Sequence, residues 1–318
     1  MKKCLRFELV SLVFAVLLGT VQSCKENKTT DESNLALNGE KTFEEPALPK
    51  RPLSKEFKKY WYAGEAEITS YKLEQARYGE IREGNAVLVY VTEPFLKDKQ
   101  VKADGNNPDN IPVLKLNSTK NYLTGIYPYS IMSSSFYPVH DNQHALKVSF
   151  SSQEWCGQVY AQLNNREKFE IASHSYFESE GDQELELDKT ILENELWNKI
   201  RINTEELPVG EVSVIPSMEF IRLSHKELKS YTASITLNNK DGLSIYEITY
   251  PELERTLKIY FKSSFPYTIE SWSDSFKSGF GPKAKTLTST GTKIKTLNTP
   301  YWRQNANKDL YLRDSLGL

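Results

Sequence analysis

The chain has 318 residues, 26% of them charged, and a formal net charge of −2 at pH 7. These balanced charges, without any arginine-rich stripe, exclude the electrostatic footprint of a nucleic-acid-binding protein. After the first 23 residues no stretch approaches 18 consecutive apolar residues, so we predict no membrane-spanning helix there.

Residues 1–23 have the order of parts that is typical of an export signal. A basic start precedes a mostly apolar run at residues 9–18, and small and polar residues lead up to Cys24. The segment Val21-Gln22-Ser23-Cys24 resembles the lipobox of bacterial lipoproteins, in which the cysteine accepts diacylglycerol. We therefore expect a lipoprotein signal peptide at 1–23 and a lipidated Cys24 that carries acyl chains such as palmitate. The alternative is an ordinary secretory signal with an incidental cysteine.

Residues 24–50 are predicted to be the lipidated cysteine and a disordered tether, because the segment is polar and poor in aromatic residues. Residues 51–318 are predicted to be a single β-rich domain. Lys25 stands where an aspartate would favour retention in the inner membrane, so we expect delivery to the outer membrane. The acyl chains would be the anchor, with the domain facing the periplasm or the cell surface.

From residue 60 onward the sequence predicts strands. Leu146, Val148 and Phe150 alternate with polar residues, which is typical of a half-buried strand. The segments 231–237 and 243–250 flank a turn that ends in Asp-Gly, which predicts a hairpin. Further strands are expected at 87–91, 111–116, 122–136, 169–177, 257–261 and 268–272, and an exposed or edge strand at 285–297.

One segment, at about 188–201, is predicted to be a notable helix. Asp188 can cap it, and Glu195 and Lys199 are expected to pair on its surface. Its apolar residues share one face: Ile191, Leu192, Leu196, Trp197 and Ile200. The acidic segment 178–188 is expected to be a solvated loop, and a short C-terminal helix is expected at 307–316.

These elements predict a mainly β fold. The sheet is expected to be antiparallel and strongly curved, or to form a two-layer sandwich or half-barrel. Strands with one apolar and one polar face exclude the buried parallel sheet of an α/β enzyme.

Cys156 is the one cysteine that remains after the signal and the lipidation site are set aside. It follows Trp155, and His140, His144 and His174 lie near it in sequence, which is compatible with a thiol hydrolase. The other interpretation, which we favour, is a buried packing residue, since a lone cysteine is commonly a small hydrophobe in the core.

No cofactor or metal is expected from the motifs. The chain has four histidines and lacks both His-Glu-x-x-His and Cys-x-x-Cys. Residues 104–110 are faintly similar to a calcium loop, but no glutamate closes the pattern, so a polar turn is predicted.

Aromatic residues form 12% of the chain, with 18 tyrosines. Two clusters and one neighbouring residue are candidates for a contact surface for lipid, glycan or protein: Tyr60, Trp61, Tyr62, Tyr127, Tyr129 and Trp155. The alternative is ordinary packing in a sheet, which tyrosine suits.

Four segments are similar to a family of uncharacterised envelope lipoproteins of flavobacteria and other Bacteroidota: residues 71–79, 154–157, 192–197 and 277–281. Members often carry the label "septum formation inhibitor Maf". Genuine Maf proteins are nucleotide pyrophosphatases of α/β fold with a Ser-Pro-Arg-Arg motif, and this chain lacks that motif. More loosely, a β-rich lipoprotein of this size resembles periplasmic half-barrel carriers of lipids or lipoproteins.

The sequence therefore predicts a lipid-anchored outer-membrane lipoprotein of the cell envelope with a non-enzymatic binding or envelope-assembly role. The alternative function is a thiol-dependent envelope hydrolase that uses Cys156.

Overall fold

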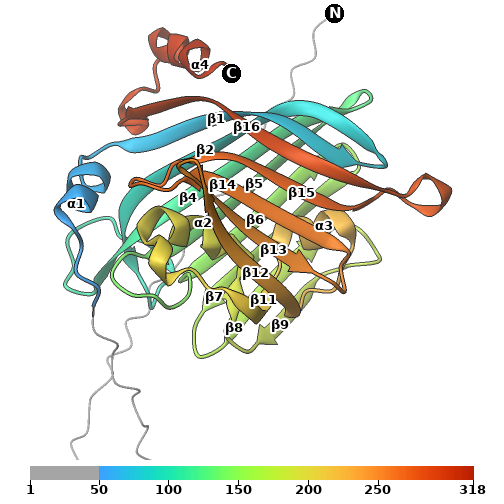
Figure 1. The fold of residues 1–318 in the computed structure, drawn as a ribbon, viewed down its shortest axis with the longest axis horizontal. Helices are drawn as coiled ribbons and strands as arrows, with labels where there is room; N and C mark the ends of the chain where they lie inside the picture. The colour runs from blue at the N-terminus through green and yellow to red at the C-terminus, as the bar shows by residue number, and fades with distance from the viewer. Residues whose placement is uncertain (1–49) are drawn as a thin grey trace, which may run out of the picture. The chain divides into compact units, whose positions relative to one another are not determined.

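The computed structural model describes residues 50–318, so the predicted signal peptide, Cys24 and the tether up to residue 49 lie outside the described residues. The described residues belong to one compact unit. They form a single 16-stranded sheet that does not close on itself. The predicted mainly β, antiparallel, curved fold is confirmed, and it is one open sheet rather than a sandwich (Figure 1).

The strands of the first half are β1 (Ala66–Arg77), β2 (Glu80–Leu96), β3 (Val101–Lys102), β4 (Asn110–Thr124), β5 (Tyr127–Pro138), β6 (Lys147–Glu154), β7 (Gly157–Asn165), β8 (Phe169–Ser175) and β9 (Gln183–Leu187). Those of the second half are β10 (Ile191–Leu192), β11 (Gly210–Ile215), β12 (Tyr231–Lys240), β13 (Leu243–Tyr250), β14 (Arg255–Lys262), β15 (Ile269–Ser278) and β16 (Lys285–Thr299).

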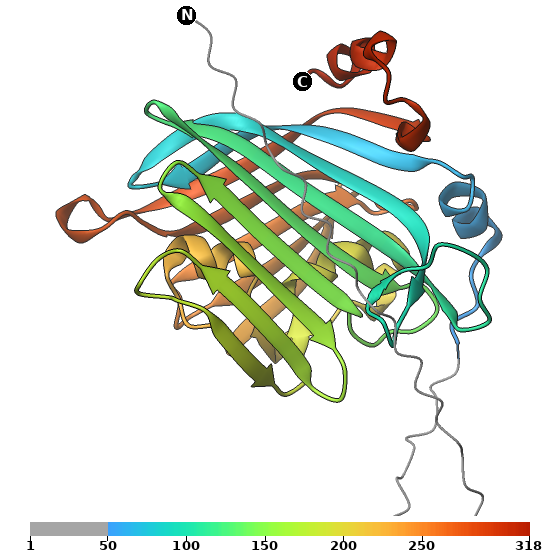
Figure 2. The same cartoon turned by 180° about the vertical axis from the view of Figure 1, so that it is seen from behind.

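The sheet consists of two meanders joined in the middle. Its order is β10-β11-β12-β13-β14-β15-β16-β1-β2-β4-β5-β6-β7-β8-β9, with β3 paired to β2. All described ladders are antiparallel except the short one between β10 and β11. The sheet curves so that β11–β15 and β4–β9 face each other across an interior (Figures 1 and 2).

Alternation of side chains explains the curved sheet's one-sided core. In β14 the buried positions are Arg255, Leu257, Ile259 and Phe261, and the residues between them are less buried. The hairpin predicted between β12 and β13 is confirmed, and its turn places Asp241 and Gly242 at φ of 52° and 77°. Asp-Gly suits this left-handed turn because glycine adopts positive φ without steric cost.

Four α-helices accompany the strands in residues 50–318: α1 (Lys55–Trp61), α2 (Glu193–Ile202), α3 (Met218–Ser224) and α4 (Tyr311–Leu316). Short 3₁₀ turns lie at Thr204–Glu206, Gly281–Lys283, Tyr301–Arg303 and Asn307–Leu310. Helices α2 and α3 lie inside the curve of the sheet (Figures 1 and 2). The C-terminal helix was predicted, whereas α1 and α3 were not.

The helix predicted at 188–201 begins later than expected. Asp188 is exposed and does not cap it, and Ile191–Leu192 form β10, which pairs with β11. The expected loop at 178–188 contains β9, which pairs with β8. Tertiary strand pairing therefore overrides local helical and loop preferences in this region.

The structure also tests two expectations on exposure, and the one on the surface of α2 was wrong. Glu195 and Lys199 are buried, because α2 lies inside the sheet; Glu195 accepts from the backbone N of Ala145 at 2.7 Å, and Lys199 donates to Asn142 at 2.8 Å. The segment 285–297 belongs to β16, and most of its side chains are exposed, as one of the two alternatives predicted. It is not an edge strand, because β16 pairs with β15 and β1.

Candidate functional site

Helix α3 divides the interior of the curved sheet into two spaces. One is a polar cavity between α2, α3 and the strands β1, β2, β4, β5 and β14–β16. The other is an apolar groove between α3 and the strands β6–β9. The seven residues of α3 are held in place by Ser217, whose side chain accepts from the backbone N of Phe220 at 3.3 Å and caps the helix.

The polar cavity has a volume of about 70 Å³. One water needs about 10–15 Å³ on such a measure, so the space holds about five waters or one very small solute. Among the residues that line it are Gln75, Lys120, Ser133, Glu193, Glu219, Arg255, Trp272, Asp274 and Ser289.

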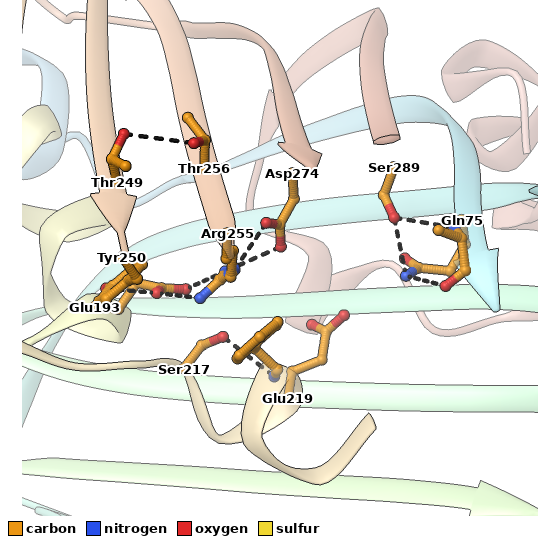
Figure 3. Close-up of polar contacts among 12 residues, drawn as sticks. Gln75, Glu193, Ser217, Glu219, Thr249, Tyr250, Arg255, Thr256, Asp274 and Ser289 are labelled. Atoms are coloured by element: carbon orange, nitrogen blue, oxygen red, sulfur yellow. Dashed lines mark hydrogen bonds and ion pairs between the residues drawn. The ribbon is translucent and has the colours of Figure 1, made fainter. Parts of the chain in front are cut away.

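Arg255 is the central charge of this cavity (Figure 3). Its Nη1 and Nη2 donate to Glu193 at 2.6 and 2.8 Å, and its Nε and Nη2 donate to Asp274 at 2.7 and 2.9 Å. The guanidinium also stacks on Phe220, with its carbon 4.0 Å from the ring centroid. One buried cation thus holds two carboxylates, each in bidentate geometry.

The two carboxylates respond differently to this environment. Burial opposes ionisation of Glu193, but Arg255 and the hydroxyl of Tyr250 hold the pKa of Glu193 below its usual value. Burial raises the pKa of Asp274, and the nearby charge of Glu193 adds to that effect, although Arg255 acts against it. Asp274 keeps 18% of its side-chain surface accessible, and it lines the cavity.

Lys120 and Glu219 form a second ion pair at the cavity, with 2.7 Å between Nζ and Oε1. Lys120 comes from β4 and Glu219 from the first turn of α3. In Figure 3, Glu219 extends from α3 towards β15, the strand that carries Asp274. The pair is mostly buried, so it ties α3 to the sheet more firmly than an exposed pair would.

Three buried polar atoms of residues that line the cavity have no partner among the described residues: Oε1 of Gln75, Oγ of Ser133 and Oγ of Ser224. The residues Gln75 and Ser133 are 3% and 8% exposed. The amide nitrogen of Gln75 donates to Ser289 at 3.2 Å, which fixes the side chain (Figure 3). Such atoms are costly to leave unpaired, so they mark places where water or a ligand binds.

The apolar groove is larger, with a volume of about 450 Å³. This lies within the range of about 300–1,000 Å³ that is typical of ligand pockets. The apolar residues that line it are Phe150, Val159, Ala161, Leu185, Met218, Ile221 and Leu228. Polar and charged residues complete the lining: Ser173, Ser179, Glu180, Gln183, Arg222, His225, Lys226 and Glu227.

Charged residues stand at the mouth of the groove. Glu180 accepts from Arg222 Nη1 at 2.8 Å and lies 3.0 Å from His225 Nδ1, so the segment after β8 is joined to the end of α3. Burial raises the pKa of Glu180, but His225 and Arg222 outweigh it and lower the pKa below its usual value. His225 ends α3 in a left-handed conformation, with φ of 50°.

Exposed and half-buried aromatic side chains gather around the turns at the end of the sheet away from α1. We call Tyr78, Tyr127, Trp155, Tyr176 and Phe280 the aromatic rim. Ring centroids lie 6.3 Å apart for Tyr127 and Trp155 and 6.3 Å apart for Tyr78 and Phe280, and Phe280 lies 5.6 Å from His225. The β1–β2, β4–β5 and β15–β16 turns lie at the end of the sheet away from α1 (Figure 2).

Gly157 is required for this arrangement. A Cβ atom there would lie 2.7 Å from the ring of Tyr176, so a side chain would displace that ring. Trp155 and Tyr176 are 69% and 77% exposed, so the rim presents large apolar rings at the surface of the domain.

The predicted aromatic binding residues do not form one surface. Tyr60, Trp61 and Tyr62 belong to α1 and its end, at the opposite end of the sheet, and Trp61 is buried. Tyr129 is also buried, stacked on Tyr122 at 5.1 Å. Tyr127 and Trp155 belong to the aromatic rim.

Cys156 is not the buried packing residue that we favoured. It lies exposed in the turn between β6 and β7, where strand pairing leaves no cover. The hydrogen bond and charge of Glu154 raise the pKa of its thiol, which disfavours the thiolate. The three histidines near it in sequence contact other groups: His140 contacts Arg51 O, His144 contacts Glu195 and His174 contacts Asp182.

Residues 50–318 contain no group of three or more histidine, cysteine, aspartate or glutamate side chains placed to hold a metal ion. In that same range no helix is long and apolar enough to cross a membrane. The segment 104–110 forms turns, in which Asn110 donates to Gly105 O at 2.9 Å.

Comparison of the chain with protein-family models, with curated proteins and with solved structures gave no match. The candidate sites are therefore argued from the geometry of this chain alone.

Proposed function

We propose that the protein is a lipid-anchored outer-membrane lipoprotein with a non-enzymatic binding role, and that it holds the acyl chain of a lipid in the apolar groove. The observation that carries the proposal is a groove of about 450 Å³ with an apolar wall, whose residue His225 contacts Phe280 of the aromatic rim. Holding a lipid chain next to the membrane is a task in envelope assembly.

The chemistry of the groove supports an acyl chain over a glycan. The apolar part of the lining, with Val159, Ala161 and Ile221, offers dispersion contacts to a methylene chain but no hydrogen bonds to a sugar. The polar part, which includes Glu180 and Arg222, suits the headgroup of the same lipid. A flexible chain of methylene groups gains about 0.8 kcal/mol for each buried CH₂. The polar cavity, at about 70 Å³, is too small for either ligand.

The aromatic rim supports a role close to a membrane. Tryptophan and tyrosine favour the boundary between lipid and water, because their rings are apolar and each carries a polar group. The predicted lipidation of Cys24 would keep the domain near such a boundary, on the periplasmic face or at the cell surface.

The proposal is tested by filling the groove. In the chain carrying Cys24→Ser, which lacks the predicted acyl chains as competitors, cis-parinaric acid is titrated and its fluorescence recorded. Ala161 is buried in β7 and lines the groove, so Ala161→Phe should raise the dissociation constant by about tenfold or more.

Gln162→Phe is the matched control, because Gln162 is the next residue of β7 and does not line the groove. This variant should bind the probe as tightly as the native protein does. Circular dichroism verifies that both variants fold. No binding by the native sequence, or equal binding by Ala161→Phe, would contradict the proposal.

The alternative of a thiol-dependent hydrolase has its own readout. Because the pKa of Cys156 is raised, iodoacetamide should alkylate the native protein slowly near neutral pH. Cys156→Ser should leave the melting temperature and parinaric acid binding unchanged, because the side chain is exposed. Rapid alkylation at neutral pH would support the hydrolase instead.

A further inference from the structure

The charged residues that line the apolar groove do not balance one another. Two permanent cations line it, Arg222 and Lys226, and Arg222 is paired with Glu180. The second carboxylate of the lining, Glu227, lies 3.2 Å from the ammonium group of Lys229, which does not line the groove. In the described part of the chain Lys226 forms no ion pair, so its positive charge at the groove is uncompensated.

Arg222 itself has a donor without an acceptor. Its Nη1 donates to Glu180 at 2.8 Å, and its guanidinium lies over the ring of Phe177, with the carbon 4.5 Å from the centroid. Its Nε is buried and has no hydrogen-bond partner among the described residues, and 10% of the side chain is exposed. A buried N–H of a charged group is costly to leave unpaired, so Arg222 can accept a further anionic partner.

The contacts of Glu180 show that this part of the groove suits a carboxylate. Arg222 Nη1 and His225 Nδ1 lie 2.8 and 3.0 Å from its Oε1, and Ser175 Oγ donates to its Oε2 at 3.0 Å. Burial raises the pKa of Glu180, but His225 and Arg222 outweigh that effect and lower the pKa. These distances place three polar groups around one point, where the surroundings favour a negative charge.

We propose that the lipid held in the apolar groove is anionic, and that its headgroup binds to Arg222 and Lys226 beside Glu180. The headgroup is the carboxylate of a fatty acid or the phosphate of a lysophospholipid. This inference rests on the proposed function, because the acyl chain occupies the apolar part of the groove. Arg222 would be shared between Glu180 and the headgroup, as Arg255 is shared between two carboxylates, and Lys226 would balance the added negative charge.

The experiment compares cis-parinaric acid with its methyl ester in the chain carrying Cys24→Ser. The two probes have the same chain, but only the acid is ionised at neutral pH. We expect this chain to bind the acid about tenfold more tightly than the ester, because the acid accepts charge-assisted hydrogen bonds. The ester reports on the groove alone, and the ratio of the two dissociation constants reports on the headgroup site.

Substitutions in the same chain locate the site. Arg222→Gln should lower the ratio about tenfold, and Lys226→Gln about threefold, because Lys226 is exposed and its charge is screened. Lys240→Gln is the matched control, because it removes the same charge from an exposed position at the far end of β12, and it should leave the ratio unchanged. Circular dichroism verifies folding, and Lys226→Gln serves if Arg222→Gln fails to fold.

Displacement of bound cis-parinaric acid identifies the headgroup. Oleic acid and oleoyl lysophosphatidic acid should both displace the probe, and the stronger of the two identifies carboxylate or phosphate. Monooleoylglycerol, which is neutral and has the same chain, should displace it least.

Equal binding of the acid and the ester, or a ratio that neither Arg222→Gln nor Lys226→Gln lowers, would overturn this inference. The proposed function would stand in both cases, since the ester would still bind. Binding of neither probe would overturn both.

Discussion

Arg201 and Arg255 are both fully buried arginines, yet they are matched with negative charge in different ways. Arg201 donates to the two carboxylate oxygens of Glu67 at 2.6 Å each and to Pro266 O at 2.8 Å. It also lies over the rings of Tyr90 and Trp61, with its carbon 4.7 and 5.0 Å from their centroids. Here one cation meets one carboxylate in a fully packed setting.

Arg255 instead meets two carboxylates beside a cavity. The difference appears in the carboxyl groups: Arg201 outweighs burial and lowers the pKa of Glu67, whereas burial keeps the pKa of Asp274 raised. The balanced pair of Arg201 and Glu67 holds α2 to β1, and its two charges neutralise each other. The cluster around Arg255 is not balanced in this way, because two carboxylates share one guanidinium.

The largest effect is expected at the balanced pair. Glu67→Gln leaves the guanidinium of Arg201 buried without a counter-charge, which should cost about 3–5 kcal/mol of unfolding free energy. Urea denaturation at pH 7 measures the loss. The control is Glu247→Gln, whose partner Lys258 is 37% exposed, and it should cost about 0–1 kcal/mol. Similar losses in the two variants would break the comparison.

A smaller effect is expected for Glu193→Gln. Arg255 keeps Asp274 as a partner, and the glutamine oxygen still accepts from Tyr250 or Arg255, so we expect a loss of about 1–3 kcal/mol. The same urea titration measures it. A loss as large as that of Glu67→Gln would show that Asp274 does not compensate Arg255.

The smallest effect is expected for Asp274→Asn, and it depends on pH. Because its pKa is raised in the folded state, Asp274 contributes stability below its usual pKa and loses that contribution as the pH rises through the folded pKa. Asparagine cannot ionise, so the variant should gain stability relative to the native protein as the pH rises from acid to neutral.

The contribution of Glu67 to stability has the opposite pH dependence. Because the pKa of Glu67 is lowered in the folded state, this residue stabilises the fold above its usual pKa, and the contribution is lost on acidification.

The prediction for Asp274 is measured by urea titrations of Asp274→Asn and of the native protein from acid to neutral pH. A constant difference between them would contradict a raised pKa for Asp274.

Much of the sheet could be predicted because its strands alternate in the sequence. Residues 243–250 and 257–261 were predicted as strands and lie in β13 and β14. Helices α1 and α3 have seven residues each, too few for a helical period to stand out. Their positions are set by burial of Trp61 and Phe220 against the sheet, which local sequence does not contain.

The sequence contains a signal for the polar cavity that was not among the predictions. Arg255 shares the inward phase of Leu257, Ile259 and Phe261, and Asp274 lies two residues from both Trp272 and Phe276. A charge in the apolar phase of a strand indicates a buried polar site. Glu193, the partner of Arg255, is 62 residues away in the chain, and only the fold brings these two residues together.

The aromatic candidates were harder to separate, because tyrosine and tryptophan serve both the core and the surface. Polar residues stand close to both Trp61 and Trp155 in the sequence, yet one is 2% and the other 69% exposed. The difference arises from strand geometry: Trp155 is at a turn tip, and α1 folds Trp61 inward.

The ladder between β1 and β16 pairs two strands that are far apart in the chain. Ala66 faces Thr299 in this ladder, whereas most other ladders join strands that follow one another. Closing so long a loop costs more chain entropy than closing a hairpin, and non-local pairing slows folding. We therefore expect each meander to form by itself and β1 to meet β16 in the slowest step. A circular permutant with its new termini at 188–190, between β9 and β10, would make these two strands neighbours in the chain and should fold faster.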